Sequence, residues 1–133
     1  MIGLDTNVLL RVLLDDDDPA QSKRARALLA EHGQAHGSVR LCDVVLLETL
    51  WTLKRQFGHG RSTLAGIFKR LLDEPAFALS DRERLADVLH RYINSKADIG
   101  DCFIAADNER AGCAYTATFD GDAVSLAGME LVP

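Results

Sequence analysis

The sequence predicts an α/β fold in which a mostly parallel sheet is covered by helices on both faces. Short apolar runs typical of buried strands alternate along the chain with amphipathic helical segments. No two of these runs are joined by the two-residue turn of a hairpin, so helical crossovers between parallel strands are expected. A chain of 133 residues that is 47% hydrophobic can bury one core but is too short for two ordinary domains. We therefore expect residues 1–133 to form a single domain.

The first part of the chain is expected to alternate strand, helices, strand and helix. Residues 1–5 are a short apolar run ending in Asp-Thr-Asn, which predicts a buried strand leading into the start of a helix over 7–14. An acidic turn follows, and Asp-Pro before residue 20 predicts an N-cap and a helix over 20–31. Residues 38–42 predict a second strand. The next helix, over 43–57, is strongly apolar, and Asp43 is expected to cap it.

The second part repeats this alternation. Residues 62–73 carry five large apolar side chains at helical spacing, and 77–79 predict a short strand. Asp81 is expected to cap another amphipathic helix. An alanine-rich helix over 100–111 is ended by a glycine, and strands at 113–118 and 129–132 close the chain.

Composition excludes several classes of protein. No stretch of 18 or more apolar residues exists, and the N-terminal apolar segment is interrupted by Asp5 and Arg11, so neither a membrane span nor a signal peptide is expected. The three cysteines are widely spaced and form no Cys-x-x-Cys pair, which indicates buried free thiols in a reducing cytoplasm. His32 and His36 have helical metal-ligand spacing, but the glycines between and after them favour a loop.

Several acidic residues occupy positions that can be explained either by a functional site or by ordinary helix caps, turns and ion pairs. Glu48 lies within a run of apolar residues, so the sequence predicts a buried carboxylate that is either paired with a base such as Arg55 or bound to a metal. Asp5 and Asp98 could equally be helix caps. Asp101 could be a first-turn residue favoured by the helix dipole, and Asp120 could be a turn residue.

These acids are more informative as a set. Ligands of parallel α/β folds bind beyond the carboxyl ends of the strands, and Asp5 and Asp120 both follow predicted strands. Carboxylates gathered at one sheet edge repel each other strongly unless a cation binds. Oxygen donors without histidine or cysteine select Mg²⁺ or Mn²⁺ rather than zinc. The formal net charge of −5 equals the charge of the five acids Asp5, Glu48, Asp98, Asp101 and Asp120, because the other 15 acids balance 15 lysines and arginines.

Four segments resemble the acidic motifs of PIN-domain nucleases, especially the VapC-like toxins of bacterial toxin–antitoxin pairs. They span almost the whole chain in the family's order: Ile2-Gly3-Leu4-Asp5-Thr6-Asn7-Val8-Leu9-Leu10, Leu46-Leu47-Glu48-Thr49-Leu50-Trp51-Thr52-Leu53, Ala97-Asp98-Ile99-Gly100-Asp101-Cys102-Phe103-Ile104-Ala105-Ala106 and Thr118-Phe119-Asp120.

The resemblance implies a role for each matching residue. It implies a Rossmann-like parallel sheet flanked by helices, with catalytic and metal-binding carboxylates at Asp5, Glu48, Asp101 and Asp120. Asp98 is implied as an additional metal ligand. Thr6, Asn7 and Thr118 match polar positions that support the site. Two choices stay open: Asp98 or Asp101 as the primary third ligand, and Asp120 or Asp122 as the fourth.

The implied activity is endonucleolytic cleavage of RNA, with one or two Mg²⁺ or Mn²⁺ ions activating a water for attack at phosphorus. The resemblance also implies a homodimer and an antitoxin partner. Phosphate contact is predicted for the basic segment 54–70, which contains no acid and carries Lys54, Arg55, Arg61, Lys69 and Arg70. A solvated corner between helices is the competing interpretation of that segment. The alternative function is a non-catalytic domain of the same fold that binds nucleic acid or a partner.

Overall fold

A computed structural model describes residues 1–133, and its strands fall into two parallel sheets. In the first sheet, β2 (Val39–Arg40) lies between β1 (Ile2–Gly3) and β3 (Phe77–Ala78). The second sheet pairs β4 (Thr116–Thr118) with β5 (Met129–Leu131). The predicted α/β class with parallel strands is confirmed, and the strands form sheets of three and two rather than one continuous sheet.

Four helices surround the first sheet. They are α1 (Thr6–Leu13), α2 (Pro19–His32), α3 (Asp43–Arg55) and α4 (Arg61–Asp73). The predicted cap of α2 is confirmed, since Asp18 accepts a hydrogen bond from the Gln21 N–H. The predicted cap of α3 is wrong. Cys42 occupies the N-cap position, and the Asp43 side chain instead contacts Ser80 and Arg84.

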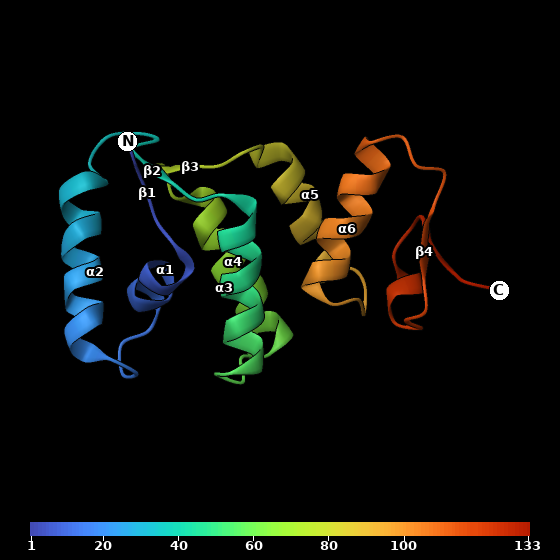
Figure 1. Ribbon diagram of the computed structural model, residues 1–133, viewed down its shortest axis with the longest axis horizontal. Coiled ribbons are helices and arrows are strands. Elements are labelled where there is room, and N and C mark those ends of the chain that lie inside the picture. The colour runs from blue at the N-terminus through green and yellow to red at the C-terminus, as the bar shows by residue number, and fades with distance from the viewer.

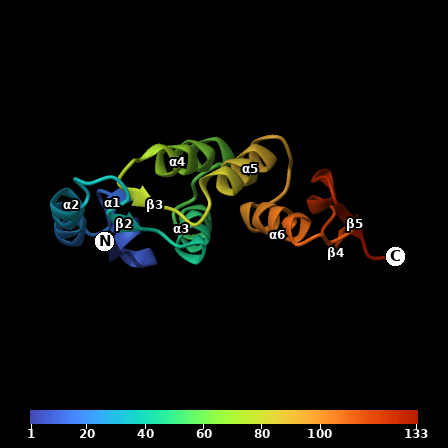
Figure 2. The same ribbon diagram turned by 90° about the horizontal axis from the view of Figure 1, so that it is seen from above.

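Helices α5 (Arg82–Ile93) and α6 (Ile99–Arg110) connect the two sheets. The short 3-10 helix η1 (Ala123–Ser125), which the sequence pattern did not predict, lies between β4 and β5. Asp81 caps α5 as expected, accepting from the Arg84 N–H at 3.0 Å. The elements follow one another along the molecule, from α2 at one end to β4 and β5 at the other (Figures 1 and 2).

One apolar cluster runs through the molecule despite the separation of the sheets. It contains 28 buried residues, beginning with Leu4 after β1 and ending with Met129 in β5. The α3 residues Leu46, Leu50 and Leu53 lie near its centre and are essentially inaccessible to solvent. Helix α3 packs against α1, α4 and α6, so it joins the N-terminal helices to the C-terminal part of the molecule.

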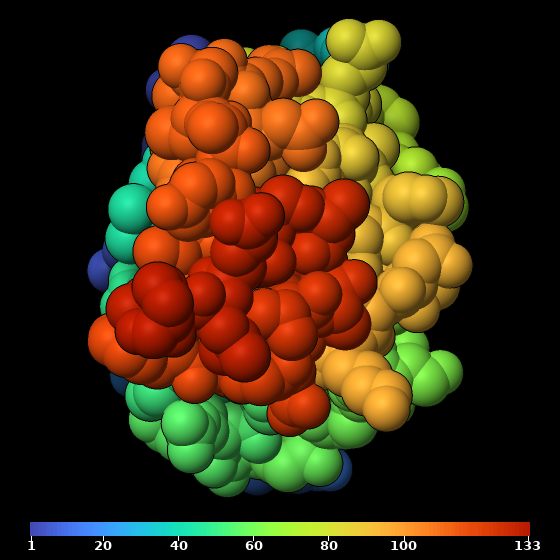
Figure 3. Space-filling view, turned by 90° about the vertical axis from the view of Figure 1, so that its right-hand side faces the viewer, coloured from blue at the N-terminus to red at the C-terminus, as the bar shows by residue number.

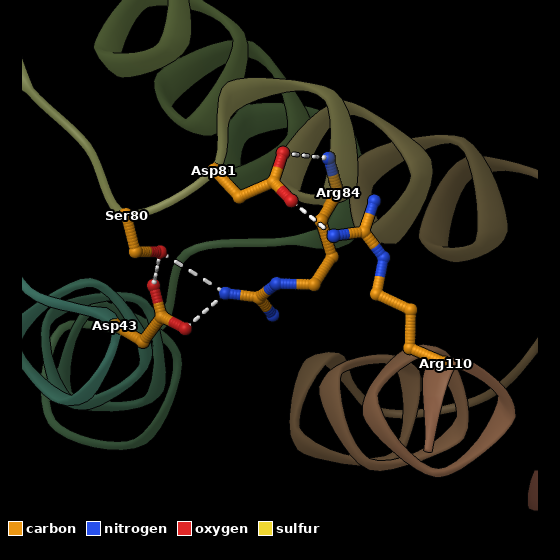
Figure 4. Close-up of polar contacts among 5 residues, drawn as sticks. All are labelled: Asp43, Ser80, Asp81, Arg84 and Arg110. Carbon is orange, nitrogen blue, oxygen red and sulfur yellow. Dashed lines mark hydrogen bonds and ion pairs between the residues drawn. The ribbon is translucent and has the colours of Figure 1, made fainter. Parts of the chain in front are cut away.

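A polar clasp of Asp43, Ser80, Asp81, Arg84 and Arg110 fixes α5 between α3 and α6 (Figure 4). The Arg84 guanidinium is largely buried, forms an ion pair with Asp43 and donates to Ser80 Oγ at 3.1 Å. Arg110 on α6 forms an ion pair with Asp81 at the start of α5. Because buried charge is costly unless paired, these contacts hold the three helices in one relative placement.

Two other expectations concern the cysteines and the absence of a membrane span. Only Cys102 is buried, whereas Cys42 and Cys113 are exposed, so the prediction of three buried thiols is wrong for two of them. Both lie in connecting segments outside the helices and strands, where no neighbouring element covers them. None of the helices is both long and apolar enough to cross a membrane.

Candidate active site

Asp5 lies directly after β1 and begins α1. Its carboxylate Oδ1 accepts a hydrogen bond from the Val8 N–H at 3.0 Å, so the capping role considered from sequence is present. The side chain is nevertheless exposed. Its second oxygen accepts no hydrogen bond within the chain, which leaves it available to a ligand.

Glu48 is exposed, which contradicts the expectation of a buried carboxylate. The reason is the orientation of α3, whose buried face carries Val45, Leu46, Thr49, Leu50 and Leu53. Glu48 instead shares the open side of the helix with Val44 and Trp51, which are 65% and 44% exposed. Apolar neighbours in the sequence therefore did not imply burial. No base pairs with Glu48; its Oε1 accepts from the Thr6 hydroxyl at 2.8 Å.

Asp5 and Glu48 line a common open cavity of about 470 Å³ between α1 and α3. Its other polar walls include Thr6, Asn7 and Thr52. A neighbouring cavity of about 380 Å³, between α1 and α2, shares Asp5 and Asn7 with it. The first and second acidic motifs, 43 residues apart in sequence, thus meet at one solvent-accessible place beyond the carboxyl end of β1.

A second acidic group forms at the start of α6. Asp98 occupies the N-cap position without a capping hydrogen bond and forms an ion pair with Lys54 at 2.9 Å. Partial burial raises the pKa of Asp101, and repulsion from the Asp120 and Asp98 carboxylates raises it further. Asp120 follows β4, so this group joins the third and fourth motifs.

The turn after β4 is held by its own polar groups. Thr118 Oγ1 accepts from the Asp120 N–H at 3.0 Å, and Asp120 Oδ1 accepts from the Asp122 N–H at 2.9 Å. Asp120, rather than Asp122, is the acid whose charge acts on Asp101. Thr118 thus contacts the backbone of Asp120.

The two acidic groups do not merge within one chain. Asp98, Asp101 and Asp120 do not line the cavity of Asp5 and Glu48, and no three acidic, histidine or cysteine side chains gather closely enough to hold a metal ion. The donor type, carboxylate oxygen, suits Mg²⁺ or Mn²⁺. Mg²⁺ is commonly held by one or two protein carboxylates, with waters in its remaining positions. Asp5 and Glu48 at their shared cavity therefore fit such an ion.

Three of the five cations in the basic segment are engaged by other residues of the chain. Arg61 packs over the Tyr92 ring at 4.0 Å and donates to the carbonyl oxygens of Tyr92, Ser95 and Ala97 at 2.6 to 3.0 Å. These structural contacts close the loop before α6 and engage three of the five N–H donors of the Arg61 guanidinium. Lys54 binds Asp98, and Lys69 forms an ion pair with Asp73 one turn away.

The other two basic residues of the segment are exposed. The Arg55 guanidinium lies 5.6 Å from the centre of the Trp51 ring, on the open side of α3. Arg70 is exposed on α4 and makes no ion pair.

Sequence reasoning missed two cations beside Asp5. Arg11 lines both cavities, and Arg24 lines the smaller one from α2. Arg11 forms an ion pair with Asp17, whereas Arg24 makes none. The spacing of Asn7 and Arg11, four residues apart on one helix, could have indicated the first of them. Nothing in the sequence indicated that α2 packs beside α1 at this point.

The comparison with known families agrees with the arrangement of the fold and acids. A family model described as PIN domain matches residues 2–129. No curated protein matches the chain closely enough to supply a more specific activity. Acids follow β1 and β4 and lie on α3 and α6, and the family model matches nearly the whole chain. The chain therefore belongs to the PIN domain family, whose members are generally nucleases that use divalent metal ions.

Proposed function

We propose that this protein is a divalent-metal-dependent endoribonuclease that hydrolyses RNA phosphodiester bonds. The observation that carries the proposal is the open cavity shared by Asp5 and Glu48 in a chain of the PIN family. Two exposed carboxylates from different motifs, one of them oriented by Thr6, form part of the donor set that Mg²⁺ or Mn²⁺ prefers. A purely structural role would not require both carboxylates to face solvent.

We assign the site residues as follows. The carboxylates of Asp5, Glu48, Asp101 and Asp120 are proposed as catalytic and metal-binding groups, and Asp98 as an additional ligand in competition with its ion pair to Lys54. Thr6, Asn7 and Thr118 support them. Thr6 contacts Glu48, Asn7 lines the cavity beside Asp5, and Thr118 contacts the backbone of Asp120.

RNA is proposed to lie along the open side of α3 toward the corner with α4. Lys54 and Arg55 are on α3, seven residues or fewer from Glu48, while Lys69 and Arg70 are on α4. The Lys54 and Lys69 ion pairs are solvent-exposed, so phosphate can replace their acidic partners at low cost. Arg61 is not included, because its guanidinium is engaged by the loop before α6.

We further propose that the protein is the toxin of a toxin–antitoxin pair, active in the cytoplasm as a homodimer. The resemblance of the four acidic motifs to VapC-like toxins supports this, and three free cysteines suit a reducing compartment. Expression of the chain alone should arrest growth of the host cell. Co-expression with the product of a small upstream reading frame should relieve the arrest if that product is the antitoxin.

The nuclease assignment is tested with the full chain and a labelled RNA pool, with Mg²⁺, with Mn²⁺ or with chelator. Cleavage should require the metal and should be lost in Asp101→Asn. Asp107→Asn is the matched control, since Asp107 is an exposed acid on the same helix and outside the site. Cleavage that persists in chelator, or that survives Asp101→Asn, would contradict the proposal.

A second candidate is a non-catalytic domain that binds RNA. The separation of the acids into two groups within one chain favours it, since no three acidic, histidine or cysteine side chains gather closely enough to hold a metal ion. This candidate predicts RNA binding that does not depend on metal, with no cleavage under any metal condition. The same experiment, read by both gel shift and cleavage, separates the two functions.

A further inference from the structure

We propose that the smaller cavity, between α1 and α2, is a phosphate subsite in which Arg11 is the principal ligand and Arg24 the second. It binds an internal phosphate of RNA, next to the phosphate that is cleaved. The inference rests on the proposed function for the identity of the polyanion. The preference for an anion is argued from the charges and hydrogen bonds of the cavity itself.

The smaller cavity is electropositive within an acidic chain. Its walls carry one carboxylate, Asp5, and the two guanidinium groups of Arg11 and Arg24, whereas the whole chain has a formal net charge of −5. Asp5 already accepts the Val8 N–H with one carboxylate oxygen and forms no ion pair with either arginine. A cavity of about 380 Å³ with this excess of positive charge favours an anion.

The Arg11 guanidinium is held in place by two partners outside its own helix. Its Nε donates to the Gln21 amide oxygen on α2 at 2.9 Å, and one terminal nitrogen forms an ion pair with Asp17 in the turn between the helices. An arginine side chain has five N–H donors, so three remain without a partner in the chain. Arg11 is therefore fixed in position with donors still free for a phosphate, which guanidinium groups bind in fork geometry.

A purely structural role does not account for this arrangement. Exposed ion pairs add little to stability, and the Asp17 side chain is 43% exposed. Arg26 provides the structural contact in the same region. It pairs with Asp15, donates twice to the Val12 carbonyl at 3.1 Å and lines neither cavity. Because Arg26 already ties α2 to α1 and to the turn, Arg11 is not needed for that purpose.

The smaller cavity is open to a polymer and adjoins the place proposed for cleavage. All of its lining residues lie between positions 5 and 28. Helices α1 and α2 form one end of the molecule (Figures 1 and 2), while Figure 3 shows the C-terminal segment lying over α6 at the other end. The two cavities share Asp5, Asn7 and Arg11. A phosphate bound in the smaller cavity is therefore a neighbour, along the RNA chain, of the phosphate proposed to be cleaved at Asp5 and Glu48.

The first test measures RNA binding rather than cleavage. A labelled RNA with hydroxyl groups at both ends is titrated with the full chain in chelator, at several salt concentrations. Arg11→Ala should weaken binding about tenfold and reduce the slope of log affinity against log salt by about one unit. Arg26→Ala is the matched control, because it removes the same charge from an arginine outside both cavities.

Three results of this titration would overturn the assignment. The first is a salt slope in Arg11→Ala that equals that of wild type. The second is an equal loss of affinity in Arg26→Ala, which would indicate an effect of net charge alone. The third is an effect of Arg11→Ala that is confined to RNA with a terminal phosphate, which would exclude an internal phosphate as the ligand.

The second test asks whether Gln21 positions Arg11. Gln21→Ala should weaken RNA binding less than Arg11→Ala does and should leave the salt slope unchanged, because no charge is removed. In the double variant, binding should be no weaker than in Arg11→Ala alone, since Gln21 acts through Arg11. Losses that add in the double variant would contradict the positioning role.

The third test uses inorganic pyrophosphate as the probe, without RNA or metal and at an ionic strength matched with chloride. About 10 mM pyrophosphate should raise the melting temperature of wild type and of Arg26→Ala by about 5 °C, as expected for a dissociation constant of about 1 mM. Arg11→Ala should show a much smaller rise. No rise in wild type, or equal rises in wild type and Arg11→Ala, would overturn the subsite. A wild type that neither binds nor cleaves RNA would defeat the proposed function instead, and these melts would still decide whether the cavity binds phosphate.

Discussion

Thr6 donates its hydroxyl to Glu48 across 42 residues of sequence, at an oxygen-to-oxygen distance of 2.8 Å. The contact joins the first residue of α1 to the open side of α3 and orients Glu48 toward the cavity that it shares with Asp5. A threonine next to the strand-end aspartate thus positions the acid of the second motif.

Replacing Thr6 tests this positioning role. Thr6→Ala should lower RNA cleavage about tenfold, since a hydrogen bond to a charged group contributes about 1.5 kcal/mol. Thr6→Ser keeps the hydroxyl and should restore most of the rate. Thr52→Ala is the control, because Thr52 lines the same cavity without a side-chain hydrogen bond to Glu48. Equal loss of cleavage in the alanine and serine variants would indicate that the hydroxyl is irrelevant.

The two acidic groups should differ in their effect on stability. Asp101 is partly buried and repelled by Asp120 and Asp98, so Asp101→Asn should raise the melting temperature in chelator, by about 1 kcal/mol of unfolding free energy. Asp5→Asn should be nearly neutral, because asparagine also caps helices. Mg²⁺ should stabilise wild type more than either variant. A lower melting temperature for Asp101→Asn in chelator would mean that this acid is structural.

Arg24 is expected to contact an RNA phosphate, because it lines the cavity beside Asp5 and has no acidic partner. Arg24→Ala should weaken RNA binding and reduce the slope of log affinity against log salt by about one unit. Lys23→Ala is the matched control, as Lys23 is exposed on the same helix outside that cavity. Filter binding at several salt concentrations measures the RNA affinity of each variant and its salt dependence. An identical slope for Arg24→Ala and wild type would place the RNA elsewhere.

The Asp81 carboxylate makes stability depend on acid pH. The hydrogen bond from the Arg84 N–H, followed by that from the Arg110 side chain, lowers the pKa of Asp81 below its ordinary value of 3.8. A lowered folded-state pKa stabilises the fold above the unfolded-state value, and this contribution is lost as pH falls from about 3.8 through the folded-state pKa. Arg110→Ala brings the two pKa values closer together. Urea midpoints should therefore fall less steeply with acidification in Arg110→Ala than in wild type or the Arg70→Ala control. Parallel pH profiles would show that the contact has no energetic role.

Much of the fold could be predicted from local sequence chemistry. Periodicity predicted every α-helix to within a few residues, since amphipathic spacing and caps such as Asp18 and Asp81 act over a single turn. Boundaries were less accurate. Helix α3 ends at Arg55 rather than Phe57, and β4 begins at Thr116 rather than Cys113, because tertiary contacts decide where an element stops.

The sequence by itself determined the α/β alternation, the PIN-type order of acids and the placement of Asp5 and Asp120 after strands. Only the tertiary structure decided that Glu48 faces solvent, that Arg61 closes a loop and that Arg24 lies beside Asp5. It also decided that the strands form two sheets. The local pattern of apolar and polar residues indicates which residues favour a strand or one face of a helix. Which face is covered, which edge is paired and which cation finds a partner depend on elements distant in sequence, whose packing no local pattern encodes.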